Sequence, residues 1–196
     1  MISKLDDKTV HLCVDMQNMF AEGTPWHTPW MSRVLPRVAT LARHRPDRTL
    51  FTRFIPADAP GQGEGAWAAY WRRWACMTRA ELPDAAMELV KPLAELSPPA
   101  EVLDKRFYSP WYRTDLDERL RRRGADTLVV SGAETDICVL AAVLGAVDRG
   151  FRVVIAEDGI CSSADETHDA LVKVYHDRYG QQVETATVDE IVAAWS

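Results

Sequence analysis

Short runs of apolar and β-branched residues recur along the chain, and segments with helical spacing separate them. Each run has the length and composition of a strand that is buried on both faces. The runs expected to form strands are 10–15, 48–55, 100–105, 127–130, 151–157 and 182–187. Between them, apolar residues three and four apart predict helices, for example over 31–43, and Asp158-Gly159 is expected to end the fifth strand in a turn.

This alternation of strand-like and helical segments predicts a parallel sheet that is covered by helices on both faces. We expect a three-layer α/β/α sandwich with a mostly parallel, six-stranded Rossmann-like sheet. The chain has 196 residues, enough for one domain with a sizeable core, and neither a linker nor an internal repeat divides it. Residues 1–196 are therefore expected to form a single domain.

The composition excludes several classes of function. The net charge is −6 and the longest basic run is three arginines at 121–123, which disfavours nucleic-acid binding. No apolar stretch reaches transmembrane length and residues 1–8 lack a signal-peptide core, so we expect a cytoplasmic protein without a membrane partner. The four cysteines include no CxxC pair, which argues against a disulfide framework or a zinc site.

Reactive side chains lie at the ends of three predicted strands. Asp15 ends the first, Lys105 ends the third, and Cys138 follows the fourth in the first turn of a predicted helix. If each residue is considered alone, Cys138 could be a buried structural thiol, and Asp15 could be a turn residue or a helix cap. The carboxyl ends of parallel strands meet at one edge, however, where Asp15 could accept the thiol proton. Helix dipoles and the lysine ammonium are expected to lower the pKa of the thiol.

Three segments resemble the signature segments of the isochorismatase-like cysteine hydrolases, a superfamily that includes nicotinamidases and N-carbamoylsarcosine amidohydrolase. These segments are 14–18, 104–109 and 132–139, and the resemblance covers nearly the whole chain. It implies a catalytic triad of Asp15, Lys105 and Cys138. It also implies a non-proline cis peptide bond between Ala133 and Glu134, which directs the backbone N–H groups of Glu134 and Cys138 at an oxyanion. A homodimer or homotetramer is a further implication.

By this resemblance, Asp15 deprotonates Cys138, the thiolate attacks a carbonyl carbon, and water activated by Asp15 hydrolyses the thioester, while Lys105 holds Asp15. The expected reaction cleaves a C–N amide or ureido bond of a small molecule and needs no metal and no cofactor. Nicotinamidases carry an Asp-x-His metal motif after the second strand. Residues 52–56 contain neither a histidine nor an acid, which disfavours nicotinamide as the substrate.

Aromatic residues in the loops at the same edge are expected to line the substrate pocket. The candidates for substrate binding, from motif or loop position, are Gln17, Trp26, Trp30, Phe54, Tyr108 and Trp111. A separate aromatic stripe at helical spacing is expected to form core or the contact between subunits. The stripe comprises Trp67, Tyr70, Trp71 and Trp74.

Two other functions stay open on the sequence alone. One is vinyl-ether hydrolysis of an isochorismate-like acid, with Asp15 as general acid and Cys138 as a bystander. The other is a catalytically idle member of the superfamily that is retained as a binding module, although the intact triad argues against it.

Overall fold

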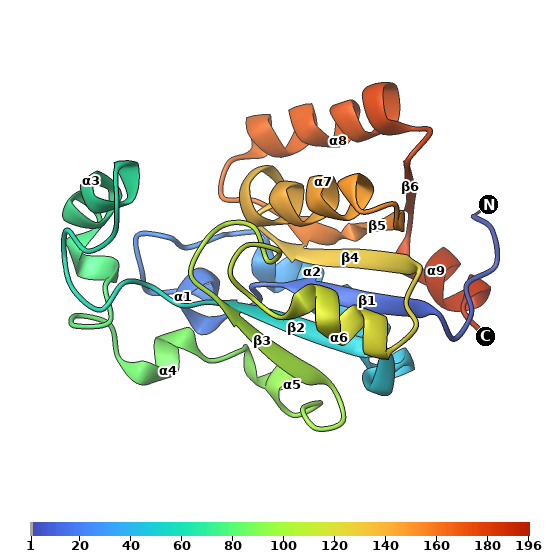
Figure 1. Cartoon of the computed structure of the whole chain (residues 1–196), viewed down its shortest axis with the longest axis horizontal. Helices are drawn as coiled ribbons and strands as arrows, with labels where there is room; N and C mark the ends of the chain where they lie inside the picture. Colours follow the sequence, from blue (N-terminus) through green and yellow to red (C-terminus); the bar gives the residue numbers. More distant parts are fainter. Residues whose placement is uncertain (1) are drawn as a thin grey trace.

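The computed structural model describes residues 2–196 and confirms an α/β sandwich built on a six-stranded, entirely parallel sheet (Figure 1). Along the sheet the strand order is β3-β2-β1-β4-β5-β6. The strands are β1 (Thr9–Val14), β2 (Thr49–Phe54), β3 (Glu101–Lys105), β4 (Thr127–Ala133), β5 (Arg152–Cys161) and β6 (Val183–Ala186). Each of the six expected runs therefore contains one of these strands or most of it.

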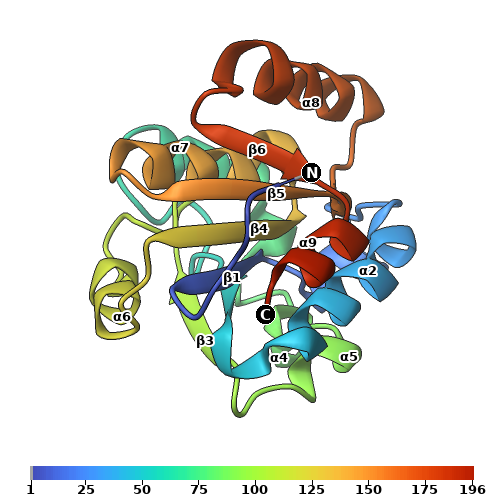
Figure 2. The ribbon, with the colours of Figure 1, turned by 90° about the vertical axis from the view of Figure 1, so that its right-hand side faces the viewer.

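Helices cover both faces of the sheet (Figure 2). The longer helices are α2 (Met31–His44), α3 (Ala66–Arg73), α6 (Leu116–Arg122), α7 (Leu140–Asp148), α8 (Asp165–Tyr179) and α9 (Val188–Ala194). The short ones are α1 (Asn18–Ala21), α4 (Asp84–Met87), α5 (Lys91–Ala94), η1 (Pro46–Arg48), η2 (Ala75–Met77) and the π-helical turn η3 (Thr135–Val139). Helices α6 and α7 lie on one side, and α2 and α9 on the other. None of the helices within residues 2–196 is long and apolar enough to cross a membrane.

The central strand β1 is buried along its whole length, and its side chains enter two different cores. Val10, Leu12 and Val14 pack with residues of α6, α7 and α8. Cys13 packs with residues of α2 on the opposite face. This alternation is what a parallel strand with both faces covered requires.

His11 lies in β1 between two hydroxyl groups and is fully buried. Its Nδ1 is 3.3 Å from Thr49 Oγ1 and its Nε2 is 2.7 Å from Ser131 Oγ. Burial lowers the pKa of His11 to about 3, because an imidazolium ion would lose its hydration there. A neutral imidazole has one donor and one acceptor, which suits two hydroxyl groups.

We therefore expect the free energy of unfolding to fall as the pH drops below about 6.5, the ordinary pKa of histidine. Between that value and the folded pKa of about 3, the unfolded chain binds a proton that the folded chain does not. Urea denaturation of wild type and His11→Gln should show that wild type loses about 2 kcal/mol more between about pH 7 and about pH 5. Equal losses in the two proteins would contradict a neutral, buried His11.

Strand β5 is longer than the sequence predicted, and the turn expected at Asp158-Gly159 is wrong. Both residues lie inside the strand, where the pairing register between β4 and β5 shifts. Asp158 instead joins two helices: Oδ1 accepts a hydrogen bond from the N–H of Val188 at 2.7 Å, and Oδ2 accepts one from Arg37 Nε at 2.6 Å. The dipeptide is typical of turns, but these two partners come from distant parts of the chain.

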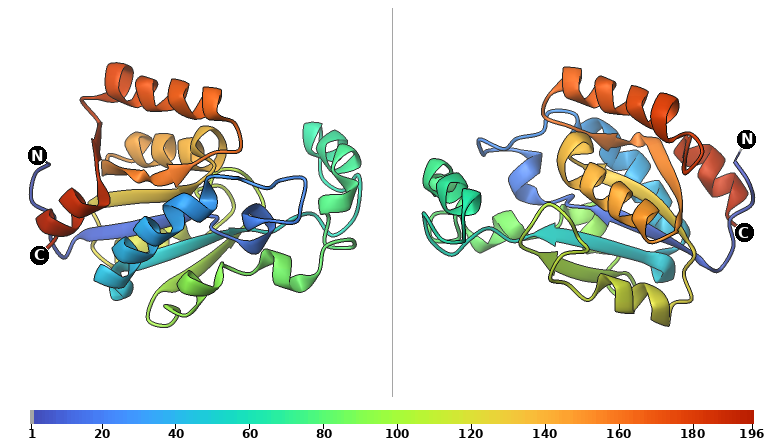
Figure 3. Two further views of the ribbon diagram at one scale, coloured as in Figure 1. Left: turned by 180° about the vertical axis from the view of Figure 1, so that it is seen from behind. Right: turned by 45° about the horizontal axis from the view of Figure 1, so that its top comes forward.

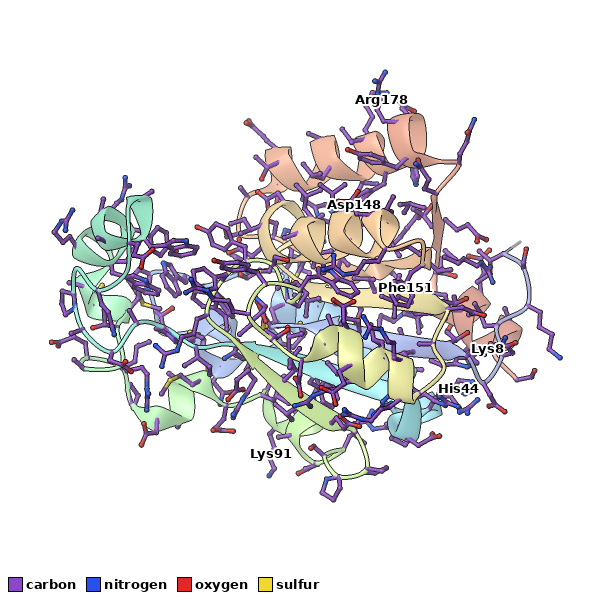
Figure 4. The ribbon with its side chains drawn as sticks, in the orientation of Figure 1. Lys8, His44, Lys91, Asp148, Phe151 and Arg178 are labelled. Carbon is purple, nitrogen blue, oxygen red and sulfur yellow. The ribbon has the colours of Figure 1, made fainter. Side chains whose placement is uncertain are left out.

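The carboxyl ends of β1, β2, β3 and β4 point toward the end of the molecule where α3 stands clear of the sheet (Figure 3). Lys8 and His44, close to the starts of β1 and β2, mark the opposite end (Figure 4). The loops that follow β1, β2 and β3 therefore surround the same edge as the turn after β4.

Candidate active site

Asp15, Lys105 and Cys138 meet at this edge of the sheet. Asp15 follows β1, Lys105 ends β3, and Cys138 lies in η3 just after β4. The Lys105 Nζ is 2.7 Å from Asp15 Oδ2 and 3.3 Å from Cys138 Sγ. All three residues are buried. The structure thus brings together the three side chains that the sequence placed at strand ends.

Asp15 is held by the neighbouring strand. Its φ of 50° is left-handed, a conformation that aspartate adopts more readily than most residues with a side chain. The Thr52 hydroxyl donates to Asp15 Oδ1 at 2.5 Å. The other oxygen, Oδ2, has the charge contact with Lys105 but no aligned hydrogen bond within residues 2–196. Oδ2 therefore has a lone pair that is not used by an aligned hydrogen bond from any of these residues.

Lys105 is a charged side chain that is buried away from solvent. Its Nζ donates to the carbonyl of Phe107 at 3.1 Å and to Cys138 Sγ, and lies 5.1 Å from the centre of the Phe54 ring. Burial alone would lower the pKa of Lys105, but the negative charge of Asp15 and the hydrogen bond to Cys138 outweigh burial and raise it. The side chain stays an ammonium ion at neutral pH.

Burial raises the pKa of the Cys138 thiol above its usual range. The Lys105 ammonium lowers the pKa, as expected, but the effect of burial is larger, and the Asp15 carboxylate raises the pKa further. The expected net lowering of the pKa of Cys138 is therefore wrong, because it left out the loss of hydration. A thiol that is protonated at rest needs a base to become a nucleophile, and Asp15 is the adjacent carboxylate.

The turn between β4 and η3 supplies backbone groups beside the thiol. Gly132 has a φ of 110°, and a Cβ there would lie 2.1 Å from the carbonyl oxygen of Val14, so only glycine fits. The peptide bond between Ala133 and Glu134 is cis, as the resemblance implied. The N–H of Glu134 makes no hydrogen bond to any of residues 2–196, so it is free to bind a ligand oxygen.

A cavity of about 300 Å³ opens above Cys138. Asp15, Glu134 and Cys138 form part of its lining, and the rest is largely aromatic. The aromatic residues are Phe20, Trp26, Phe54, Tyr70, Trp74 and Tyr108. A mostly apolar cavity with a few polar groups is typical of a small-molecule site. Within residues 2–196, no group of three or more His, Cys, Asp or Glu is placed to hold a metal ion.

Trp26, Phe54 and Tyr108 line the cavity, but Gln17 does not, contrary to its predicted role in substrate binding. The Gln17 side chain is fully buried. Its Nε2 donates to the carbonyls of Phe54 and Met87, and its Oε1 accepts from the N–H of Phe54. Both amide hydrogens and the amide oxygen thus join the segment after β1 to β2 and α4.

Trp30 and Trp111 also lie away from the cavity, which corrects two further expectations. Trp30 is partly exposed beside a different hollow near Cys161. Trp111 is buried against α7, where its Nε1 donates to the carbonyl of Ala142 at 2.9 Å. Both residues sit in loops near the site, but position in a loop does not fix the direction of a side chain.

The aromatic stripe on α3 supplies site residues that the sequence interpretation missed. Tyr70 and Trp74 line the cavity. Trp71 is buried within the chain, with its ring stacked 6.1 Å from that of Phe54, so it is not an exposed contact for a second subunit. Tyr70 and Trp74 are four residues apart, which places them on the same face of a helix. This spacing was the sequence feature that could have identified them as a pair lining one site.

Comparisons with known proteins agree with this architecture. A family model described as isochorismatase domain matches residues 9–187. The uncharacterized isochorismatase family protein YecD of Escherichia coli O157:H7 is 30% identical over 139 residues, which are 71% of this chain and 63% of that protein. The chain thus spans less than two thirds of this curated relative's length.

Solved structures share the fold at low sequence identity. A cysteine hydrolase from Pseudomonas syringae pv. phaseolicola 1448A has a TM-score of 0.80 and 24% identity, with 96% of this chain and 92% of that one covered. N-carbamoylsarcosine amidase from Thermoplasma acidophilum has a TM-score of 0.76 and 23% identity, with 93% and 98% covered.

Proposed function

Because the chain belongs to the isochorismatase family of hydrolases, we propose that it cleaves a C–N amide or ureido bond of a small molecule through a thioester on Cys138. The observation that carries this proposal is the position of Lys105 Nζ, 2.7 Å from Asp15 and 3.3 Å from Cys138, beside the cavity. The cysteine hydrolase and the amidase among the similar structures support the same class of reaction.

In the first half of the proposed reaction, Asp15 Oδ2 takes the proton of the Cys138 thiol as sulfur attacks the carbonyl carbon. The carbonyl electron pair moves onto oxygen, and the N–H groups of Glu134 and Cys138 bind the resulting oxyanion. When the tetrahedral intermediate collapses, the C–N bond breaks and Asp15 returns its proton to the departing nitrogen. The products of this half are an amine or ammonia and a thioester on Cys138.

In the second half, Asp15 removes a proton from water and the oxygen attacks the thioester carbon. The same N–H groups bind the second oxyanion, the C–S bond breaks, and Asp15 returns the proton to the Cys138 sulfur. Lys105 keeps its charge in both halves. It holds Asp15 in place and stabilises the thiolate whenever it forms. No step of this scheme uses a metal ion.

The charges around the cavity favour this reaction over the vinyl-ether alternative. The described lining includes Asp15 and Glu134 but no arginine, lysine or histidine. A dicarboxylate such as isochorismate would meet these carboxylates with only the buried Lys105 to offset them. A neutral or cationic amide has no such penalty.

The experiment that tests the proposal is a panel of small amides and ureides assayed for release of ammonia or amine, with isochorismate assayed in parallel. We expect turnover of at least one amide or ureide. After rapid denaturation of the working enzyme, mass spectrometry should find an acyl group on the peptide that contains Cys138. Turnover of isochorismate with every amide and ureide inert would instead support Asp15 as a general acid, and an inert panel with isochorismate also inert would support the idle binding module.

A further inference from the structure

One wall of the cavity is a cluster of aromatic rings around Trp26. The Trp26 ring centre lies 6.1 Å from those of Phe20, Phe54 and Tyr70, and 5.8 Å from that of Trp74. Phe54 is the last residue of β2, and the other rings come from segments that lie beyond the carboxyl ends of the strands, so all of them meet at this edge of the sheet. Aromatic faces carry partial negative charge and attract cations.

Glu134 adds a carboxylate to this aromatic cavity. Its Oε2 accepts hydrogen bonds from the backbone N–H of Ser163 at 2.9 Å and from the Ser163 hydroxyl at 2.5 Å, and Ser162 Oγ is 3.3 Å away. Its Oε1 has no hydrogen-bond partner among residues 2–196, and Glu134 is one of the residues that line the cavity. The carboxylate is therefore fixed through one oxygen, and the other is available to a ligand.

The charge of Glu134 has no counterpart in the cavity. The other lining carboxylate, Asp15, is paired with Lys105 at 2.7 Å. Glu134 makes no ion pair with any group of residues 2–196, and its known partners are neutral serines. A fixed negative charge beside aromatic faces, with little water between, is the environment in which an ammonium group binds best.

We propose that the substrate carries a cationic group, an ammonium or quaternary ammonium, which binds between Glu134 and the Trp26 aromatic cluster while the scissile carbonyl lies at Cys138. The identity of the reacting bond rests on the proposed hydrolase function, but the cation site rests on the cavity alone. Glu134 is then a specificity-determining residue in addition to the donor of one oxyanion N–H. A cavity of about 300 Å³ restricts the substrate to a small molecule.

A matched pair of amides tests this proposal. N,N,N-trimethylglycinamide and 3,3-dimethylbutanamide have the same shape, but only the first carries a charge. Binding is measured by calorimetry to Cys138→Ala protein, in which turnover is blocked. We expect the cationic amide to bind about tenfold more tightly, and we expect Glu134→Gln in the same background to remove most of that preference. Binding of the neutral amide should change by less than about twofold, because the glutamine oxygen can still accept from Ser163.

Asp136→Asn is the control, because it removes a charge two residues away at a side chain outside the cavity lining. It should leave the preference for the cationic amide unchanged. Equal affinity for the two amides, tighter binding of the neutral one, binding of neither, or an unchanged preference in Glu134→Gln would each overturn the proposal. Ammonia release by wild type is scored separately. A retained cation preference without release would count against hydrolysis only, and release from neutral amides without a cation preference would count against the cation site only.

Discussion

Replacement of Cys138 by alanine is expected to lower kcat/KM for any amide or ureide substrate by about 10⁴-fold or more, the loss typical when a covalent nucleophile is removed. Cys138→Ser should be nearly as inactive, because a hydroxyl is a far weaker nucleophile for Asp15 to activate. Cys138 is buried and packs with apolar residues. Its truncation should still cost less than about 2 kcal/mol of unfolding free energy, since little volume is lost.

Cys161→Ala is the matched control for this prediction. Cys161 is buried like Cys138 and pairs with Ala133 in the sheet, but it does not line the cavity. The Cys161→Ala variant should retain wild-type turnover, with a stability similar to that of Cys138→Ala. Ammonia release measures turnover, and urea denaturation measures the free energy of unfolding. Normal turnover by Cys138→Ala would contradict the thioester mechanism, and loss of activity in Cys161→Ala would show that general disturbance of the region is enough to inactivate the protein. Alkylation of the wild-type protein is less decisive, because Cys76 is exposed.

The convergence of the three reactive groups could be predicted because it depends only on topology. Short buried runs that alternate with helices require parallel strands, and the carboxyl ends of parallel strands share one edge. Asp15, Lys105 and Cys138 each lie at such an end. The prediction that these three side chains lie close together did not depend on the order of the strands in the sheet. Lys105 in fact reaches Cys138 across two intervening strands, since β2 and β1 lie between β3 and β4.

The substrate pocket could be predicted only in part because its lining comes from several segments whose relative placement is set by tertiary packing. Gln17 lies within one signature segment and Trp111 just after another, yet each donates a hydrogen bond to a distant backbone carbonyl that the local sequence does not reveal. Tyr70 and Trp74 line the cavity because α3 stands beyond the strand ends, a placement set by long loops. The raised pKa of Cys138 could not be predicted either, because it results from burial by parts of the chain that are distant in sequence. The depth of burial depends on the surrounding packing, which helix position alone does not give.

Removal of either charge of the buried ion pair should be strongly destabilising. Lys105→Met replaces the ammonium by an apolar group of similar length and leaves Asp15 buried without a counter-charge. Asp15→Asn does the reverse, because it leaves the ammonium of Lys105 with only the neutral groups of Cys138 and Phe107 as hydrogen-bond partners among residues 2–196. We expect each single variant to lose about 3–5 kcal/mol of unfolding free energy, the cost typical of an uncompensated buried charge. Both should also lose turnover.

The double variant Asp15→Asn with Lys105→Met separates stability from catalysis. It removes both charges, so the desolvation penalty and the attraction disappear together, and we expect a stability within about 2 kcal/mol of wild type. Turnover should stay absent, because no base remains to deprotonate Cys138, whose burial keeps the thiol protonated. Urea denaturation of the four proteins gives the coupling energy, and ammonia release gives the activity. Additive destabilisation would contradict the pairing of Asp15 with Lys105, whereas activity in the double variant would contradict Asp15 as the base. A stable and inactive double variant would mean that the charges are retained for the chemistry, since the fold does not need them.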